Sequence, residues 1–140
     1  MSVVRPPHVL IFEDSEEPFF RDLAQQGARM AGWDSLEFEH VSPALHHLDE
    51  GVSALVTALG TSGNINDALQ GIYPAMPLII RSNNLSIPRA MMSAHPRAEL
   101  YTRFNTSDAV IDKINGLYIP HKISAWLLNL NVRVHRTNQA

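Results

Sequence analysis

Short apolar runs alternate with longer amphipathic stretches along this chain, and the alternation predicts its secondary structure. The uninterrupted apolar run at residues 9–12 is typical of a strand that is covered on both faces. Hydrophobic residues at helical spacing follow it and stop at Gly32, which predicts a helix. A second strand is expected at residues 36–40, and a short helix at residues 44–50. The first part of the chain therefore predicts two strand–helix pairs.

The remainder continues the same alternation. Three further strands and three further helices are expected: strands at residues 54–59, 78–80 and 99–103, and helices that begin near residues 64, 89 and 106. Five strand–helix pairs predict an α/β fold with a five-stranded, doubly wound parallel sheet between two helical layers. Ligand sites in such sheets lie beyond the carboxyl ends of the strands. Glu13 and Asp14 directly follow the first strand, so they are the first candidates for a site.

The tail contains one more amphipathic stretch, and we divide the chain into a domain at residues 1–117 and an extra extension at residues 118–140. Five apolar residues of the tail fall on one helical stripe: Ile119, Ile123, Trp126, Leu127 and Leu130. Residues 131–136 alternate like an edge strand. Two interpretations remain open. The helix either folds back onto the domain or forms a docking element for a partner, with Trp126 as an exposed anchor.

Composition excludes several classes of protein. A length of 140 residues suits a single hydrophobic core, and the absence of cysteine excludes disulfides, zinc–thiolate sites and a thiol nucleophile. A net charge of −3 does not favour nucleic-acid binding. No apolar run approaches the length of a membrane span, so we expect a cytoplasmic protein.

Four short motifs give the chain a family resemblance. They are FEDS at residues 12–15, AGW at 31–33, VSPALHHL at 41–48 and PLIIRSNN at 77–84. Over about residues 7–117 the chain resembles the receiver domains of response regulators, the CheY-like family. The resemblance implies a flavodoxin-like three-layer sandwich and a role in two-component signalling.

The resemblance also implies a set of site residues. In a receiver, two acids after the first strand help to hold magnesium, and Glu13 and Asp14 match them. Ser82 matches the hydroxyl that follows the fourth strand. Arg103 stands where the family has a lysine, and Phe104 follows it in place of the usual proline. Arginine cannot replace lysine as a compact point charge, so this part of the site is expected to be altered.

The third expected strand lacks the residue on which receiver chemistry depends. Residues 53–63, SALVTALGTSG, contain no acid, and the position of the phosphate-accepting aspartate falls on Ala58, or on Thr57 if the alignment shifts by one residue. The resemblance therefore implies a pseudo-receiver without catalytic residues and without a required cofactor. Weak Mg²⁺ binding at Glu13 and Asp14 stays open. Such a domain would act by binding a signalling protein or by forming a homodimer. Tyr101 and Trp126 are the candidate contact residues.

Other readings of these residues stay open. Glu13 and Asp14 could simply solvate a strand end ahead of a helix cap at Ser15. Alternatively, the two acids and the loop of Gly60, Thr61, Ser62 and Gly63 could form a small-molecule or nucleotide site, in a binding protein or enzyme on a related fold. Although the chain has 7 histidines, His46 and His47 are adjacent on an expected helix, so they do not form a chelating pair.

Overall fold

The structure is a computed structural model that describes residues 7–14, 18–58, 65–93, 109–112 and 118–139. Its elements in chain order are β1 (His8–Phe12), α1 (Phe19–Met30), β2 (Asp34–Phe38), α2 (Val41–Glu50), β3 (Ala54–Ala58), α3 (Ile65–Asn84), β4 (Arg89–Ser93), β5 (Ala109–Asp112) and α5 (Ile119–Gln139). Within these residues, no helix has both the length and the apolar character needed to cross a membrane.

The strands form one parallel sheet in the order β2-β1-β3-β4-β5. The chain moves from β1 outward to β2 and then returns past β1 to β3, so the direction of winding reverses between β1 and β3. In doubly wound sheets, ligands bind beyond the carboxyl ends of the strands at this reversal. Phe12 pairs with Phe38 of β2 and with Thr57 of β3, so all three strands end at a similar level.

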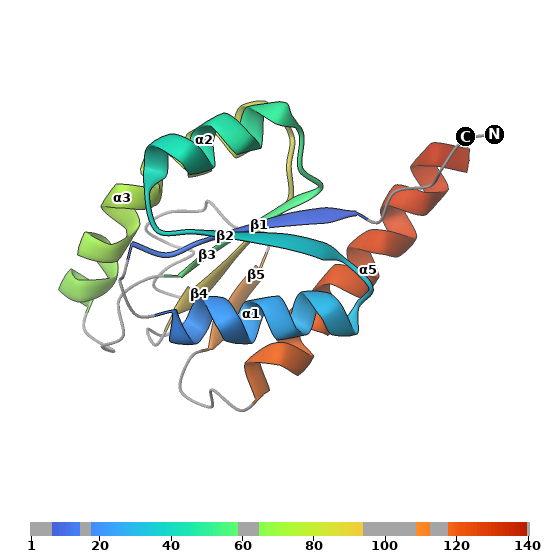
Figure 1. The fold of residues 1–140 in the computed structure, drawn as a ribbon, viewed down its shortest axis with the longest axis horizontal. Helices are drawn as coiled ribbons and strands as arrows, with labels where there is room; N and C mark the ends of the chain where they lie inside the picture. The colour runs from blue at the N-terminus through green and yellow to red at the C-terminus, as the bar shows by residue number, and fades with distance from the viewer. Residues whose placement is uncertain (1–6, 15–17, 59–64, 94–108, 113–117, 140) are drawn as a thin grey trace.

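Helices cover both faces of the sheet, as the sequence predicted (Figure 1). Alternate residues of each buried strand point to opposite faces. Val9 and Ile11 of β1 belong to the hydrophobic cluster beneath α1 and α5. Leu10 and Phe12 belong to the cluster beneath α2 and α3. The central strands are mostly apolar because each of their faces lies in a core.

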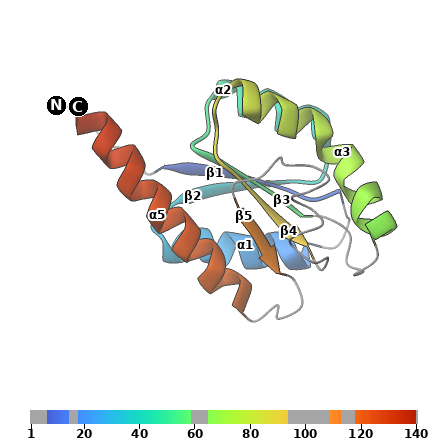
Figure 2. The same ribbon diagram turned by 180° about the vertical axis from the view of Figure 1, so that it is seen from behind.

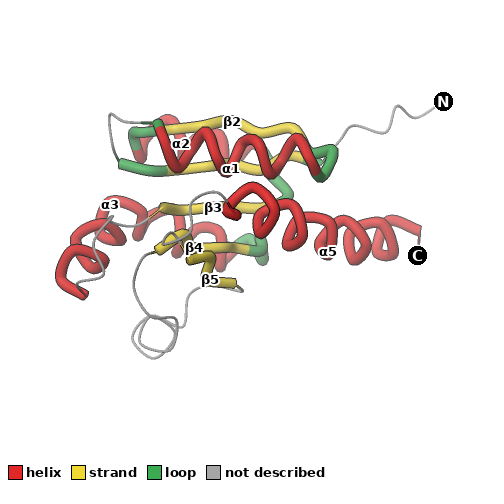
Figure 3. The backbone as a smooth tube through the Cα atoms, turned by 90° about the horizontal axis from the view of Figure 1, so that it is seen from below, coloured by secondary structure: helices red, strands yellow, loops and turns green. Residues whose placement is uncertain are grey.

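Helix α5 completes one of these two layers (Figure 2). Four of its side chains are buried in the same cluster as β1 and α1: Ile119, Ile123, Leu127 and Leu130. Of the two interpretations of the tail, the packing of these four side chains supports the helix that folds back onto the domain. The C-terminal part of α5 extends past the end of the sheet (Figure 3).

The strand expected at residues 78–80 is wrong, because these residues lie inside α3. Their apolar run directly follows Pro77, and from the sequence alone it was expected to be the fourth strand. Instead, the helix continues, and its buried residues Ala75, Leu78 and Ile79 have helical spacing while Ile80 is exposed. α3 contains two interior prolines, Pro74 and Pro77, and each costs a helix roughly 3 kcal/mol. Burial of Leu78 and Ile79, at about 1.5–3 kcal/mol each, is of a similar size and offsets much of this cost.

Three later expectations are also wrong. Residues 89–94 were expected to be helical, but Arg89–Ser93 form β4. Residues 109–117 were expected to form the last helix of the domain, but Ala109–Asp112 form β5. The edge strand expected at residues 131–136 is part of α5. Alanine and methionine favour helices in isolation, but burial between two helical layers selects the strand at β4. The strand expected at residues 99–103 lies outside the described residues.

Candidate functional site

The two acids of the FEDS motif lie at the carboxyl end of β1, as predicted. The backbone N–H of Glu13 donates to the carbonyl of Phe38 at 3.1 Å, which continues the β1–β2 pairing by one residue. The side chain of Glu13 is only 7% exposed. Asp14 is exposed to solvent. One carboxylate therefore belongs to the packed end of the sheet, and the other is free to meet a ligand from solution.

The end of β3 lies beside these acids. Thr57 pairs with Phe12, so Ala58 stands one position further along, at the level of Glu13. Ala58 is the last residue of β3, is 4% exposed and packs in the cluster beneath α1 and α5. The side chain beside Glu13 at this edge is therefore a methyl group.

Thr57 places a polar atom at the same strand end. Leu55, two residues earlier, belongs to the α2 and α3 cluster, so Thr57 faces that side of the sheet. Thr57 is 1% exposed, and its hydroxyl has no hydrogen-bond partner within the part of the chain that the structure describes. Leaving such a group unpaired costs about 1–3 kcal/mol. From the sequence, Thr57 was expected only as an alternative position for the acceptor, and the burial of its hydroxyl was not predicted.

Ser82 is not part of this site. It was expected after the fourth strand, but it lies in α3, is fully buried and donates its hydroxyl to the carbonyl of Ile79 at 2.8 Å. This local bond to the preceding turn is common for serine in helices. The error followed directly from the misplaced strand at residues 78–80.

Several other predicted residues cannot be assigned to the site. Arg103, Tyr101 and the loop at residues 60–63 lie outside the described residues. Trp126 is half-buried and packs against the core beneath α1 and α5. Its indole therefore contributes to the fold as well as to the surface, and its role as a partner anchor stays a prediction.

The observed strands place two further polar residues at this end of the sheet. β4 ends at Ser93, which is in register with Asp112 at the end of β5. Lys113 follows β5 directly in the sequence. The missed signal was the β-branched pair Val110 and Ile111 before an acid and a lysine, which is typical of a short buried strand and its polar end.

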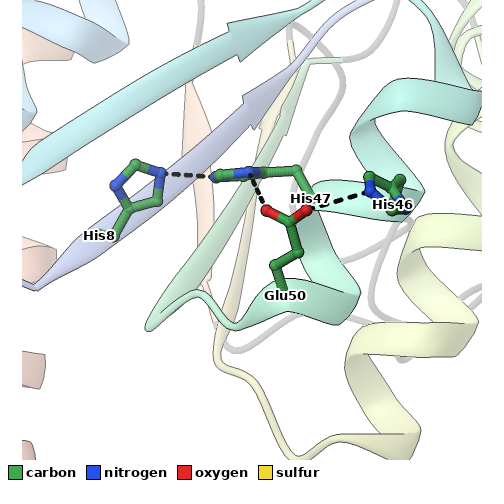
Figure 4. A network of polar contacts seen from close by, with 4 residues as sticks. All are labelled: His8, His46, His47 and Glu50. Carbon is green, nitrogen blue, oxygen red and sulfur yellow. Dashed lines mark hydrogen bonds and ion pairs between the residues drawn. The ribbon is translucent and has the colours of Figure 1, made fainter.

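A second polar cluster, which the sequence did not predict, lies at the opposite end of β1 (Figure 4). The Nε2 atoms of His8 and His47 are 2.9 Å apart. The Nδ1 atom of His47 lies 3.6 Å from one oxygen of Glu50, and the Nε2 atom of His46 lies 3.1 Å from the other. Among the described residues, no group of three or more histidine, aspartate or glutamate side chains is arranged to hold a metal ion.

A third polar cluster joins α1 to β2. Burial is the largest of the effects that raise the pKa of Glu37, and the charge of Asp22 and a hydrogen bond with it raise it further. The positive charges of Arg21 and Arg29 lower the pKa of Glu37, but by less. Two carboxyl groups that share a hydrogen bond hold a proton between them more readily than either does alone.

Comparison with solved structures identifies the fold. The signal receiver domain of an HD domain-containing protein from Pseudomonas fluorescens Pf-5 is similar, with a TM-score of 0.68 and 15% identity over 99% of this chain and 96% of that one. The chemotaxis response regulator CheY4 of Vibrio cholerae has a TM-score of 0.65 and 13% identity over 90% of this chain and 99% of that one. The response regulator TrrA from Thermotoga maritima, in complex with Mg²⁺–BeF, has a TM-score of 0.57 and 19% identity over 85% and 97%.

These matches confirm that the chain has the flavodoxin-like fold of receiver domains, as the sequence resemblance implied. No family model matches the sequence, and no curated protein matches it either. At such low identity the likeness establishes the fold alone, so the chemistry of the site has to be argued from its own residues.

Proposed function

We propose that this chain is a receiver-like regulatory module of a cytoplasmic signalling pathway that acts by binding another protein and is not phosphorylated at the usual position. The observation that carries the proposal is Ala58. It occupies the end of β3 beside Glu13, the place at which the resemblance would put the phosphate-accepting aspartate. A methyl group can neither accept a phosphoryl group nor coordinate Mg²⁺.

The remaining residues at this end of the sheet support the same interpretation. Glu13 and Asp14 keep the acidic pair, and Ser93 stands at the end of β4, where the resemblance places a hydroxyl. Lys113, in place of Arg103, then follows the fifth strand where the resemblance places a lysine. The surroundings of a receiver site are thus retained in the sequence while its acceptor is replaced.

Intact-mass spectrometry after incubation with a small phosphodonor and Mg²⁺ tests this proposal. We expect no phosphoryl adduct on the wild-type chain. A labile adduct that requires Mg²⁺ and is absent from Asp14→Ala would contradict it. The Ala58→Asp variant, run in parallel, shows whether the rest of the site still supports transfer once a carboxylate is present.

The partner surface is expected on the outer side of α5. Tyr118, just before the helix, is 60% exposed and Leu128 is 48% exposed, although both are large and apolar. Leu128 lies on the solvent-exposed side of α5, and Tyr118 directly precedes the first turn of the helix. We propose that this side binds a protein partner or a second copy of the chain. If size-exclusion chromatography gives a dimer for the wild type, Leu128→Lys should shift it to the monomer, whereas Asn129→Lys should not.

One observation favours a second candidate function, the binding of a small molecule at this edge of the sheet. Thr57, at the same strand end as the acidic pair, offers a buried hydroxyl that has no hydrogen-bond partner among the described residues. A phosphate-bearing ligand or nucleotide that accepts a hydrogen bond from Thr57 would bind saturably, and Thr57→Val would weaken that binding. Calorimetric titration of both proteins with nucleotides distinguishes this function from the proposed one.

A further inference from the structure

The contact between His8 and His47 joins two elements that are far apart in the sequence. His8 is the first residue of β1, and His47 lies in the C-terminal half of α2 (Figure 4). Their Nε2 atoms are 2.9 Å apart, and their rings meet edge to face with centroids 4.9 Å apart. The ring of Phe38 packs on the same imidazole of His47 with centroids 5.6 Å apart. The contact is therefore packed as well as polar.

This geometry limits how many protons the pair can carry. A hydrogen bond between two Nε2 atoms needs one N–H and one lone pair, so at least one of the rings has to be neutral. If both rings are protonated, two N–H groups face each other at a distance that only a hydrogen bond allows, and two positive charges oppose each other. The contact can exist in the neutral and singly charged states but not in the doubly charged state.

Charged groups around the pair favour one arrangement of protons. Glu50 faces the Nδ1 atom of His47, which favours a proton on that atom and leaves its Nε2 lone pair to accept from His8. Asp34 of β2 is in register with His8 and raises its pKa. Burial, followed by the charge of His47, outweighs this effect and lowers the pKa of His8 overall. His46 contacts the other oxygen of Glu50, and Asp49 is occupied by Arg81 of α3 at 2.6 Å.

We propose that His8 and His47 form a proton-sensitive clamp that holds the C-terminal half of α2 against the start of β1 and opens when both rings are protonated. The clamp lies at the amino-terminal end of β1, away from the acidic pair at its carboxyl end. Its opening would loosen α2, whose residues Ala44 and Leu48 pack on the sheet. The clamp requires no phosphorylation, so it does not depend on the function proposed above.

Titration of the imidazole resonances by NMR tests the coupling within the pair. We expect the midpoint of His8 to move to higher pH in His47→Gln, because this change removes the neighbouring charge and leaves a side chain that can still form a hydrogen bond. His46→Gln is the matched control, since it removes an adjacent histidine that contacts Glu50 but not His8. An unchanged His8 midpoint in His47→Gln would overturn the proposal.

Amide hydrogen exchange tests the opening of α2 in the wild-type protein, so this test needs no variant that has to fold. After correction for intrinsic rates, we expect protection in α2 to fall when the pH is lowered from about 7.5 to about 5, while protection in β3 and β4 changes less. His8→Gln should reduce this pH dependence, and His46→Gln should retain it. Equal protection of α2 in the wild type at both pH values would show that the pair is not a clamp.

Discussion

Gly27 of α1 lies directly against Ile123 of α5. A Cβ atom added to Gly27 would sit 2.6 Å from the Cβ of Ile123 and 2.7 Å from the carbonyl oxygen of Pro120. Neither atom is at the end of a flexible side chain, so neither can rotate away. The two helices approach this closely only because residue 27 has no side chain.

Gly27→Ala should therefore destabilise the protein, although alanine is usually the better residue inside a helix. Overpacking of this kind costs about 1–3 kcal/mol, whereas the gain in helix propensity is at most about 1 kcal/mol. Urea unfolding measures the difference in the free energy of unfolding. Gln26→Ala, on the exposed side of the same helix, is the control and should change it by less than about 0.5 kcal/mol. An increase in stability for Gly27→Ala would show that α5 does not pack on α1 at this point.

Leu78→Ala and Ile80→Ala test whether α3 continues through Pro77. In a helix Leu78 faces the core and Ile80 faces solvent, and the structure gives them exposures of 0% and 54%. Leu78→Ala should lower the free energy of unfolding by about 2–5 kcal/mol. Ile80→Ala should change it by less than about 0.5 kcal/mol. In a strand both side chains would point to the same face, so similar losses for the two variants would favour the original assignment.

The raised pKa of Glu37 makes stability depend on pH. The folded protein holds this proton more tightly than the unfolded chain does, so the free energy of unfolding should fall as the pH rises above the ordinary value of 4.5. Glu37→Gln cannot ionise, so its stability should fall less over this interval. Urea midpoints at a series of pH values measure the two slopes. Glu39→Gln removes a carboxylate from the turn after β2 and should keep the wild-type slope.

The lowered pKa of His8 makes stability depend on pH in the opposite direction. Its contribution to stability is complete above the ordinary value of 6.5 and is lost as the pH falls towards the lower folded-state value, because the unfolded chain then binds more protons. The wild type should therefore lose stability on acidification through this range, and His8→Gln should lose less. Thermal unfolding at several pH values measures the effect. Identical pH profiles for the two proteins would exclude it.

Ala58→Asp tests whether the acidic pair still forms a cation site. The variant places a third carboxylate beside Glu13 and Asp14, and Mg²⁺ binds such oxygen ligands. We expect Mg²⁺ to raise the melting temperature of the variant, since a ligand at 100 times its dissociation constant stabilises by about 2.7 kcal/mol. The wild type should respond less. Ca²⁺-free and Mg²⁺-free samples give the baseline, and Ala58→Asn separates the effect of charge from that of size.

The sequence by itself determined the elements whose local signals agree with their surroundings. The apolar run of β1 and the apolar stripe at residues 119–130 each favour one structure, and the alternation of such segments predicts an α/β fold. The acidic pair could also be placed at the end of β1, because both acids directly follow a strand that is easily recognised. The strand β3 was also recognised from the sequence, so its lack of an acidic residue could be seen without the structure.

Only the tertiary structure decided the elements whose local signals conflict with their surroundings. Residues 78–80 look like a strand after a proline, and β4 looks like a helix, but burial against the sheet and between two layers selects the opposite in each case. These two changes place Ser82 inside α3, away from the strand ends, and place Ser93 at the end of β4. The His8–His47 contact and the close approach at Gly27 join residues that are distant in the chain. Such pairs have no local pattern, because they exist only once the sheet has brought separate elements together.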